Sequence, residues 1–280
     1  MIKVNLEESI RQRLKNLAIT RKRPFDEILR YYAMERFLFR LSISPYTPNF
    51  FLKGGLMLKV WNSLDHRATM DIDFLARTSN QEGNLRKIIT EIAAIENKDD
   101  AIRFDTQQLT LQVTQTGGDY QGVSARFSAH LYRAEIPIFI DIGFNDIVVP
   151  KPQEIFYPTL LAMSAPKILG YTFETVVAEK LECVVKRGLV NTRMKDFYDL
   201  WTLCRSDILN SNHLELAIRK IFSNRGSPIE FPIAFTKTFY EAPETVQRWH
   251  NFLAVMGKEN ITLSNVMKDI SDFMKPFLLK

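Results

Sequence analysis

Residues 53–74 read KGGLMLKVWNSLDHRATMDIDF, a glycine pair followed further along by Asp71-Ile72-Asp73. The apolar residues before the glycines and around the two acids predict a buried strand at each end of the stretch. Gly54-Gly55 allows the backbone to approach a ligand closely. A helix that begins there would present free amide groups, which bind phosphate. The stretch therefore combines a phosphate cradle with two carboxylates.

Asp71 and Asp73 are two residues apart on a strand predicted over residues 70–75, so both side chains are expected to leave the same face. Two such carboxylates suit hard cations, and Mg²⁺ is usually held by a few carboxylates plus substrate phosphates. Two ions can stabilise both the attacking and the leaving oxygen of an in-line displacement. Magnesium-dependent nucleotidyl transfer is the leading chemistry. The alternative is a strand whose solvent face carries two acids.

Asp141 is the one acid in the strongly apolar segment 136–144, IPIFIDIGF. A buried carboxylate without a partner is costly, so this group should have a cation or hydrogen-bond donors near it. An adjacent strand would place it beside Asp71 and Asp73 as a third metal ligand. The alternative is a buried acid satisfied by backbone amides or by an arginine.

Arg67 and Thr69 precede the first acid on the same approach. Arg67 has the geometry to hold a phosphate through two parallel hydrogen bonds. A structural salt bridge is the alternative for this residue.

A second group of charged residues lies in the C-terminal half. Lys180 is surrounded by apolar residues within a predicted helix, and Asp196 and Asp199 share one face of the next helix. A lysine ammonium in that position suits a triphosphate or a leaving pyrophosphate. The alternative, compatible with the first, is that Lys180 pairs with an acid such as Asp196 and fixes the packing of two helices.

Composition sets the outer limits. The chain has 280 residues, 46% hydrophobic and 25% charged, values typical of a folded protein. No apolar run approaches the roughly 20 residues that span a bilayer, and we expect a cytoplasmic protein with two reduced cysteines. The net charge of +5 permits nucleic-acid binding without requiring it.

The hydrophobic periodicity changes along the chain and predicts an α+β fold: a mixed sheet with flanking helices, followed by a helical C-terminal domain. The expected boundaries are 1–45 for N-terminal helices packed on the core, 46–165 for the core and 166–280 for the helical domain. The first part is expected to hold helices over 5–20, 24–41, 55–62 and 80–95 and strands over 50–52, 70–75, 109–115, 122–132 and 136–144. The second part is expected to hold helices over 173–187, 193–205, 213–223, 243–256 and 262–275.

Together these segments resemble the AbiEii/AbiGii toxin family of nucleotidyltransferases, within the DNA polymerase β-like superfamily. The resemblance covers positions 36 to 200 in the expected order, and the ordered set is specific where each part alone is not. The similar segments are Arg36-Phe37-Leu38-Phe39-Arg40-Leu41-Ser42, Phe51-Leu52-Lys53-Gly54-Gly55, Arg67-Ala68-Thr69-Met70-Asp71-Ile72-Asp73, Ile140-Asp141-Ile142-Gly143, Glu179-Lys180 and Arg193-Met194-Lys195-Asp196-Phe197-Tyr198-Asp199-Leu200.

The resemblance implies that residues 46–165 form a nucleotidyltransferase core. It implies a metal site made by Asp71, Asp73 and Asp141, holding Mg²⁺ or alternatively Mn²⁺, with Lys180 and Asp196 as further catalytic residues. The implied nucleotide-binding set is Lys53, Gly54, Gly55, Arg67, Thr69, Lys180, Lys195 and Asp199. In one respect the chain departs from the superfamily pattern, because Gly55 stands where a serine hydroxyl usually contacts phosphate.

The expected function is that of a bacterial toxin that moves a nucleoside monophosphate from an NTP to an acceptor and releases pyrophosphate. The acceptor is expected to be RNA, first of all a tRNA 3′ end, with a protein hydroxyl as the alternative. A cognate antitoxin protein is the expected partner, and no membrane is involved. Two other functions stay open: an inactive module that binds nucleotides or a partner, and a two-metal RNA nuclease.

Overall fold

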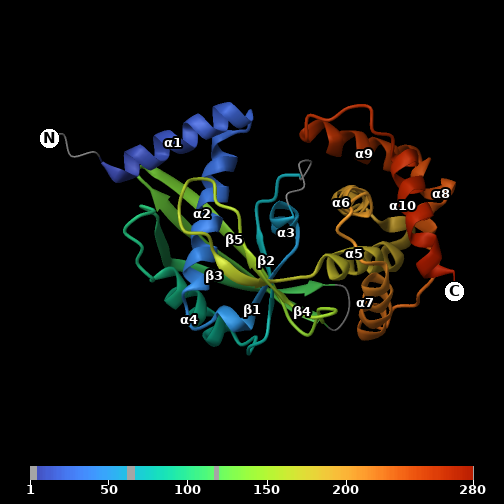
Figure 1. The fold of residues 1–280 in the computed structure, drawn as a ribbon, viewed down its shortest axis with the longest axis horizontal. Coiled ribbons are helices and arrows are strands. Elements are labelled where there is room, and N and C mark those ends of the chain that lie inside the picture. The colour runs from blue at the N-terminus through green and yellow to red at the C-terminus, as the bar shows by residue number, and fades with distance from the viewer. Residues whose placement is uncertain (1–4, 62–66, 117–119, 280) are drawn as a thin grey trace. The chain divides into compact units, whose positions relative to one another are not determined.

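The structure is a computed structural model that describes residues 5–61, 67–116 and 120–279 (Figure 1). The chain forms two compact units. Unit 1 comprises Met1–Asn62, Ala68–Asn145 and Gln153–Gly170, and unit 2 comprises Ser63–Arg67, Asp146–Pro152 and Tyr171–Lys280. Each unit is therefore built from segments that are separated in the sequence.

Unit 1 is built on one mixed sheet in the order β3-β4-β5-β2-β1-β7-β6. The pairs β1–β7 and β2–β5 are parallel, and the other neighbouring pairs are antiparallel. The strands are β1 (Phe50–Lys53), β2 (Ile72–Ala76), β3 (Arg103–Thr116), β4 (Tyr120–Leu131), β5 (Ala134–Gly143), β6 (Gln153–Phe156) and β7 (Lys167–Gly170).

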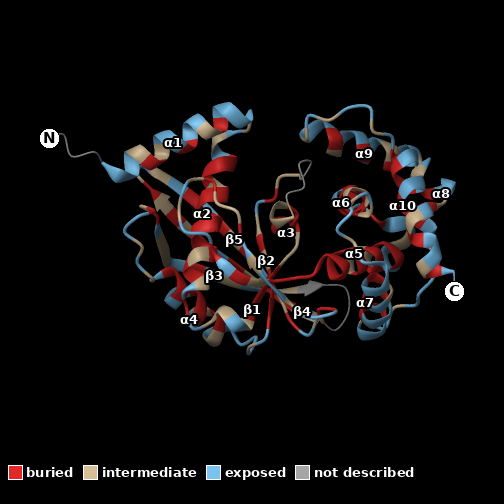
Figure 2. Cartoon of the chain, viewed as in Figure 1, coloured by how far each residue is buried: buried red, intermediate tan, exposed pale blue. Residues whose placement is uncertain are grey.

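The helices of unit 1 pack their apolar side chains into one core with the sheet. Ile138, Ile140 and Ile142 of β5 enter this core together with Phe37 and Leu38 of the second helix. Figure 2 shows that second helix, α2, buried along most of its length. The helices are α1 (Leu6–Arg21), α2 (Phe25–Ser42), α3 (Gly55–Val60) and α4 (Glu82–Ala93), with a short 3₁₀ turn η1 (Thr47–Asn49).

Unit 2 is helical throughout its described elements. The fully buried rings of Tyr198, Phe197 and Trp249 contribute to its interior. The helices are α5 (Phe173–Arg187), α6 (Met194–Cys204), α7 (Ser211–Asn224), α8 (Lys237–Tyr240), α9 (Pro243–Val255) and α10 (Leu263–Leu278), with 3₁₀ turns η2 (Gly188–Val190) and η3 (Ile233–Phe235).

The α+β class expected from the sequence is confirmed, and the expected helices and strands are found close to their predicted places, except that β3 begins at Arg103, six residues before the strand predicted over 109–115. Two strands were missed, β6 and β7, because four-residue segments with no buried position in β6 and two in β7 carry little periodic signal. Helix α3 ends at Val60, earlier than the predicted residue 62. None of the helices that the structure describes is long and apolar enough to cross a membrane.

Candidate active site

Two of the predicted acids lie side by side in the sheet of unit 1. β2 and β5 are parallel neighbours, and their register makes Asp73 the Cα partner of Asp141. Neighbouring strands are about 4.8 Å apart, so the two aspartate side chains start from adjacent positions on paired strands. The expectation that an adjacent strand places Asp141 beside Asp73 is thus met by the register.

The expected burial of Asp141 is wrong, since its side chain is exposed. The alternation along β5 explains the difference: Ile138, Ile140 and Ile142 are buried, while the odd positions face away from the core. On that outer face Asp141 accepts a hydrogen bond from the hydroxyl of Ser124, its Cα partner on β4. Sequence reasoning missed Ser124, because its role depends on strand pairing.

Asp71 does not belong to the strand that carries Asp73. β2 begins at Ile72, and Asp71 forms a bend just before it, so the predicted strand over residues 70–75 starts too early. The same-face argument of strand alternation therefore does not apply to this pair. Asp71 is half-buried and lies two residues before Asp73 in the sequence, outside the paired residues of β2.

The donor set fits a hard divalent cation. Among the described residues, no three His, Cys, Asp or Glu side chains are grouped closely enough to hold a metal ion by themselves. Mg²⁺ does not need such a cage, because it is usually bound by one or two carboxylates, several waters and substrate phosphates. Asp73 and Asp141 supply that number of carboxylates on neighbouring strands.

The first glycine of the pair packs directly against Asp73 of β2. Gly54 has φ +67°, in the left-handed region, and a Cβ atom there would lie 2.0 Å from Oδ2 of Asp73. Only glycine avoids both the backbone strain and the collision. The carboxylate of Asp73 therefore lies against the backbone of the turn. Lys53, the last residue of β1 and the Cα partner of Asp73, immediately precedes this turn.

Gly55 is glycine for a different reason. A Cβ atom at this position would lie 2.9 Å from both Cβ and Oγ1 of Thr69. The buried Thr69 is held in place because its backbone N–H donates to the hydroxyl of Tyr31 at 3.0 Å. The side chain of Thr69 thus occupies the space next to residue 55.

A buried cation that sequence reasoning missed lies on the helix after the turn. The ammonium nitrogen of Lys59 on α3 is 4.9 Å from the ring centre of Tyr31 and 5.2 Å from that of Tyr157. It is buried and has no hydrogen-bond partner in the part of the chain that the structure describes. Burial lowers the pKa of Lys59 to about 8, and the nearby Glu35 opposes this shift. A lysine within the apolar run after Gly55 was the available signal.

The charged residues predicted in the C-terminal half meet in one network inside unit 2. The Nζ atom of Lys180 on α5 lies 2.8 Å from Oδ1 of Asp196 and 2.7 Å from Oδ2 of Asp199, both on α6. Arg67 donates twice to Asp199, at 3.0 and 2.9 Å, and Arg193 pairs with Asp196. The structural alternatives considered for Arg67 and Lys180, ion pairing with acids, are therefore what the structure contains.

Mutual pairing keeps this network charged. Burial alone would lower the pKa of Lys180, but Asp199 and Asp196 outweigh it and raise that pKa above its ordinary value. Burial alone would raise the pKa of Asp196, but Lys180 and Arg193 hold that pKa well below its usual range. Three cations and two carboxylates leave one positive charge in excess, the sign that a triphosphate requires.

Two further predicted residues of unit 2 have other surroundings. Lys195 is exposed and joins none of the ion pairs found among the described residues. Glu179, which precedes Lys180, pairs instead with Arg225 at 2.8 Å. Arg225 also contacts Asp146 and Glu182, so it links α5, α7 and the segment before β6 within unit 2. This second network reads as structural.

A family model described as the nucleotidyl transferase AbiEii toxin of a type IV toxin–antitoxin system matches residues 36–274. The chain belongs to the AbiEii family. It is accordingly a nucleotidyltransferase toxin of a type IV toxin–antitoxin system, and the resemblance found in the sequence is confirmed. Family membership implies an NTP substrate and a cognate antitoxin, and enzymes of this class are typically metal-dependent.

One solved structure supports the fold, and a second is reported with it as a more distant likeness. The crystal structure of JHP933 from Helicobacter pylori has 14% sequence identity and a TM-score of 0.51, over 90% of this chain and 91% of that one. A candidate nucleotidyltransferase from H. pylori has 14% identity and a TM-score of 0.47, over 89% of this chain and 93% of that one. None of the curated proteins compared with the chain matches it. At this identity JHP933 supports the fold alone.

Proposed function

We propose that this AbiEii-family toxin transfers a nucleoside monophosphate from an NTP to the 3′ hydroxyl of an RNA acceptor, first of all a tRNA, in a Mg²⁺-dependent reaction. The observation that carries the proposal is the parallel register of Asp73 with Asp141, with the Gly54 turn against Asp73. This arrangement puts two oxygen ligands and a backbone that a ligand can approach closely on the neighbouring strands β5, β2 and β1.

In this proposal Asp73 and Asp141 hold the cation, and Asp71 is the third acid of the site. When bound, Mg²⁺ would make the acceptor hydroxyl more acidic and offset negative charge on the phosphates. Ser124 orients Asp141 through its hydrogen bond, as outer partners of metal ligands commonly do. Mn²⁺ has similar oxygen preferences and is the expected substitute.

In this proposal the phosphates of the NTP bind at the Gly54-Gly55 turn. The backbone of Gly54-Gly55 lets a phosphate come close, and the Thr69 hydroxyl beside Gly55 supplies the contact that glycine lacks. Lys53 precedes the turn and adds positive charge. Five residues of unit 2 are proposed as further participants in nucleotide binding or catalysis. Four of them belong to the network of net positive charge: Arg67, Lys180, Asp196 and Asp199. The fifth is the exposed Lys195.

The test is incubation of the protein with each α-labelled NTP, Mg²⁺ and total cell RNA or protein, followed by identification of the labelled molecule. The proposal expects label on RNA, with pyrophosphate released in equal amount. Label on a protein would show that the acceptor is a protein and not RNA. Shortened RNA without incorporated label would indicate a nuclease, and NTP binding without any turnover would indicate an inactive module.

A further inference from the structure

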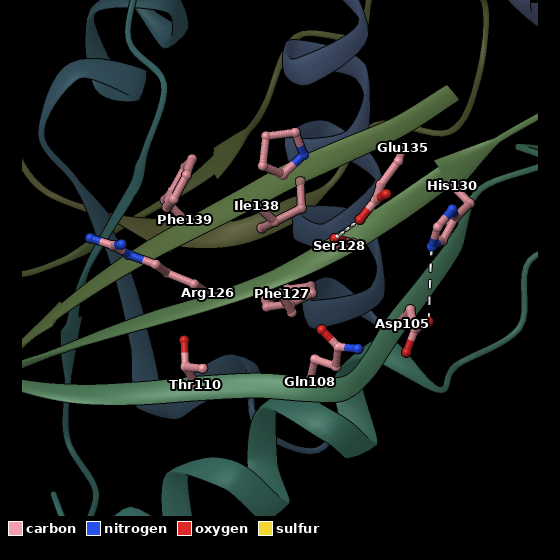
Figure 3. Close-up of a pocket in the computed structure, with 11 residues that line it drawn as sticks. Asp105, Gln108, Thr110, Arg126, Phe127, Ser128, His130, Glu135, Ile138 and Phe139 are labelled. Carbon is pink, nitrogen blue, oxygen red and sulfur yellow. Dashed lines mark hydrogen bonds and ion pairs between the residues drawn. The ribbon is translucent and has the colours of Figure 1, made fainter. Parts of the chain in front are cut away.

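A hollow of about 450 Å³ lies on the outer face of β3, β4 and β5 in unit 1. Figure 3 shows its side chains rising from the three strands. We call it the β3–β5 hollow, and the polar and apolar side chains used below are Asp105, Arg126, Ser128, His130, Glu135 and Phe139. The sheet bends here, because the register of β3 against β4 shifts between Asp105 and Thr110.

The hollow runs directly up to the acids of the candidate active site. Consecutive partners on β4 and β5 are Ser124 with Asp141 and then Arg126 with Phe139. The next outward-facing pair is Ser128 with Pro137, and the pair after it, His130 with Glu135, forms the far end. Residues on one strand face repeat about every 6.5–7 Å, so Phe139 is one step from Asp141 and Glu135 is about 20 Å away.

The end of the hollow near Asp141 combines an aromatic ring with cations. The guanidinium carbon of Arg126 is 5.4 Å from the ring centre of Phe139, and that of Arg30 on α2 is 5.8 Å from it. Figure 3 places Arg126 and Phe139 together at this end and His130 with Asp105 at the other. Aromatic rings and guanidinium groups stack nucleobases, and guanidinium groups contact phosphates.

The acids of the hollow lie at the far end and have partners. Glu135 accepts a hydrogen bond of 2.7 Å from the hydroxyl of Ser128. Asp105 lies 3.9 Å from both His130 Nε2 and Arg103 Nη1. Negative charge is therefore set away from Asp141, and the near end of the hollow presents Arg126 to an anionic ligand.

The order of the strands separates this hollow from the glycine turn. Across the sheet, β4 and β5 are followed by β2 and then by β1, which leads into Gly54. Asp141 and Asp73 thus lie between the hollow and the turn. In an in-line displacement the attacking oxygen and the leaving oxygen lie on opposite sides of the phosphorus. If the triphosphate occupies the turn, the acceptor must approach from the hollow.

We infer that the β3–β5 hollow binds the 3′-terminal nucleotides of a single-stranded nucleic-acid acceptor, with Arg126 and Phe139 holding the nucleotide closest to Asp141. This inference deepens the proposed function and rests on it for the direction of approach. The 3′ hydroxyl reaches the acids, while the strand runs along β4 and β5 toward His130. The bases find hydrogen-bonding side chains there, as single strands require for recognition of their edges.

The experiment compares wild type with Arg126→Gln and Phe139→Leu by fluorescence anisotropy, using a 5′-labelled twelve-nucleotide single-stranded RNA without NTP or metal. Arg133→Gln is the matched control, since Arg133 is exposed, lies 5.3 Å from the ring of Tyr132 and is outside the hollow. Arg126→Gln and Phe139→Leu should each weaken RNA binding by roughly tenfold. Arg126→Gln should also reduce the slope of log affinity against log salt by about 0.7.

Steady-state transfer assays on the same variants separate the two ligands. The KM for the RNA acceptor should rise with the loss of binding, while the KM for the NTP stays within about twofold. A rise in the NTP KM with unchanged RNA binding would assign the hollow to the nucleotide and overturn the inference. The inference would also be overturned if the wild-type protein does not bind the RNA. It would be overturned as well if the acceptor is a protein and Arg126→Gln weakens transfer to that protein. If the wild-type protein binds the RNA but transfers no nucleotide, and the variants lose RNA binding, the proposed function is contradicted and the inference about RNA binding stands.

Discussion

Thr69 and Gly55 share one space: a Cβ atom on Gly55 would lie 2.9 Å from both Cβ and Oγ1 of Thr69. The backbone of Gly55 is not in the left-handed region, so Thr69 alone excludes a side chain there. This contact gives a physical reason for the glycine that departs from the superfamily pattern. A serine hydroxyl at residue 55 and a threonine hydroxyl at residue 69 are alternatives in one place.

This relationship predicts the outcome of moving the hydroxyl. Gly55→Ser alone should lower stability by about 1–3 kcal/mol, the usual cost of overpacking. Thr69→Ala alone should raise the KM for the NTP by roughly tenfold or more, because it removes a hydrogen bond to a charged group. The double variant Gly55→Ser with Thr69→Gly should recover both properties in part, since the hydroxyl returns and the collision is gone.

The measurements are chemical unfolding and the NTP dependence of transfer for all three variants. Thr69→Ser is the control that keeps the hydroxyl and should behave like wild type. A Gly55→Ser protein as stable as wild type would show that Thr69 does not fill the space next to residue 55.

Ser124 should act on the cation through Asp141. Because its hydroxyl donates to Asp141, Ser124→Ala should raise the Mg²⁺ concentration for half-maximal transfer by about 10- to 100-fold, as for other partners of metal ligands. Saturating Mg²⁺ should restore most of the rate, and a chelator should abolish transfer in wild type and variant alike. An unchanged Mg²⁺ dependence would mean that Asp141 needs no orientation by Ser124.

Asp199 should be required for stability of unit 2. Its side chain is fully buried between Arg67 and Lys180. Asp199→Asn leaves two buried cations with one carboxylate fewer, and breaking such a buried pair costs about 3–5 kcal/mol. Glu244→Gln, which weakens an exposed pair with Arg248, should change stability by less than about 0.5 kcal/mol. Denaturant unfolding of both variants checks this, and equal effects would contradict a buried network.

Lys59 should make stability depend on pH in the alkaline range. Its pKa is lowered from 10.5 to about 8 in the folded protein, so the unfolded chain binds more protons between these values. Stability attributable to this residue therefore rises as the pH goes from 8 to 10.5. Lys59→Met should be more stable than wild type at pH 7 by up to about 3 kcal/mol, from 1.36 kcal/mol per pKa unit.

Urea unfolding of wild type and Lys59→Met at pH 7, 9 and 10.5 measures this difference, and contributions from other groups cancel in it. The gap should narrow as the pH rises. A gap that stays constant or widens would show that Lys59 is not destabilised in its charged form.

Much of the fold follows from local sequence patterns. Long amphipathic segments such as residues 173–187 and 193–205 predict α5 and α6 to within about a residue, because periodic burial and the stop at Gly188 are local signals. The strands β6 and β7 could not be predicted this way, since they depend on pairing with β1 and with each other.

In the candidate site, too, the features that are local in the sequence could be predicted, and those that depend on strand pairing could not. Sequence order indicated the acids and Lys180, since isolated charges in apolar segments are conspicuous. The exposure of Asp141, the hydrogen bond from Ser124 and the contact between Gly55 and Thr69 depend on register between distant strands and loops. The pairing of Lys180 with two acids was anticipated in kind, but the partnership of Arg67 with Asp199 joins residues far apart in the chain.

The most direct test of the central claim is transfer of α-labelled NMP to RNA by Asp73→Asn and Asp141→Asn. Glu154→Gln is the control, since Glu154 is an exposed acid on β6 paired with Lys167. Both aspartate variants should keep the wild-type free energy of unfolding to within about 1 kcal/mol and lose at least about a hundredfold in rate, the result of removing several kcal/mol of charge stabilisation. A folded Asp73→Asn or Asp141→Asn protein that transfers label at the rate of Glu154→Gln would contradict the account.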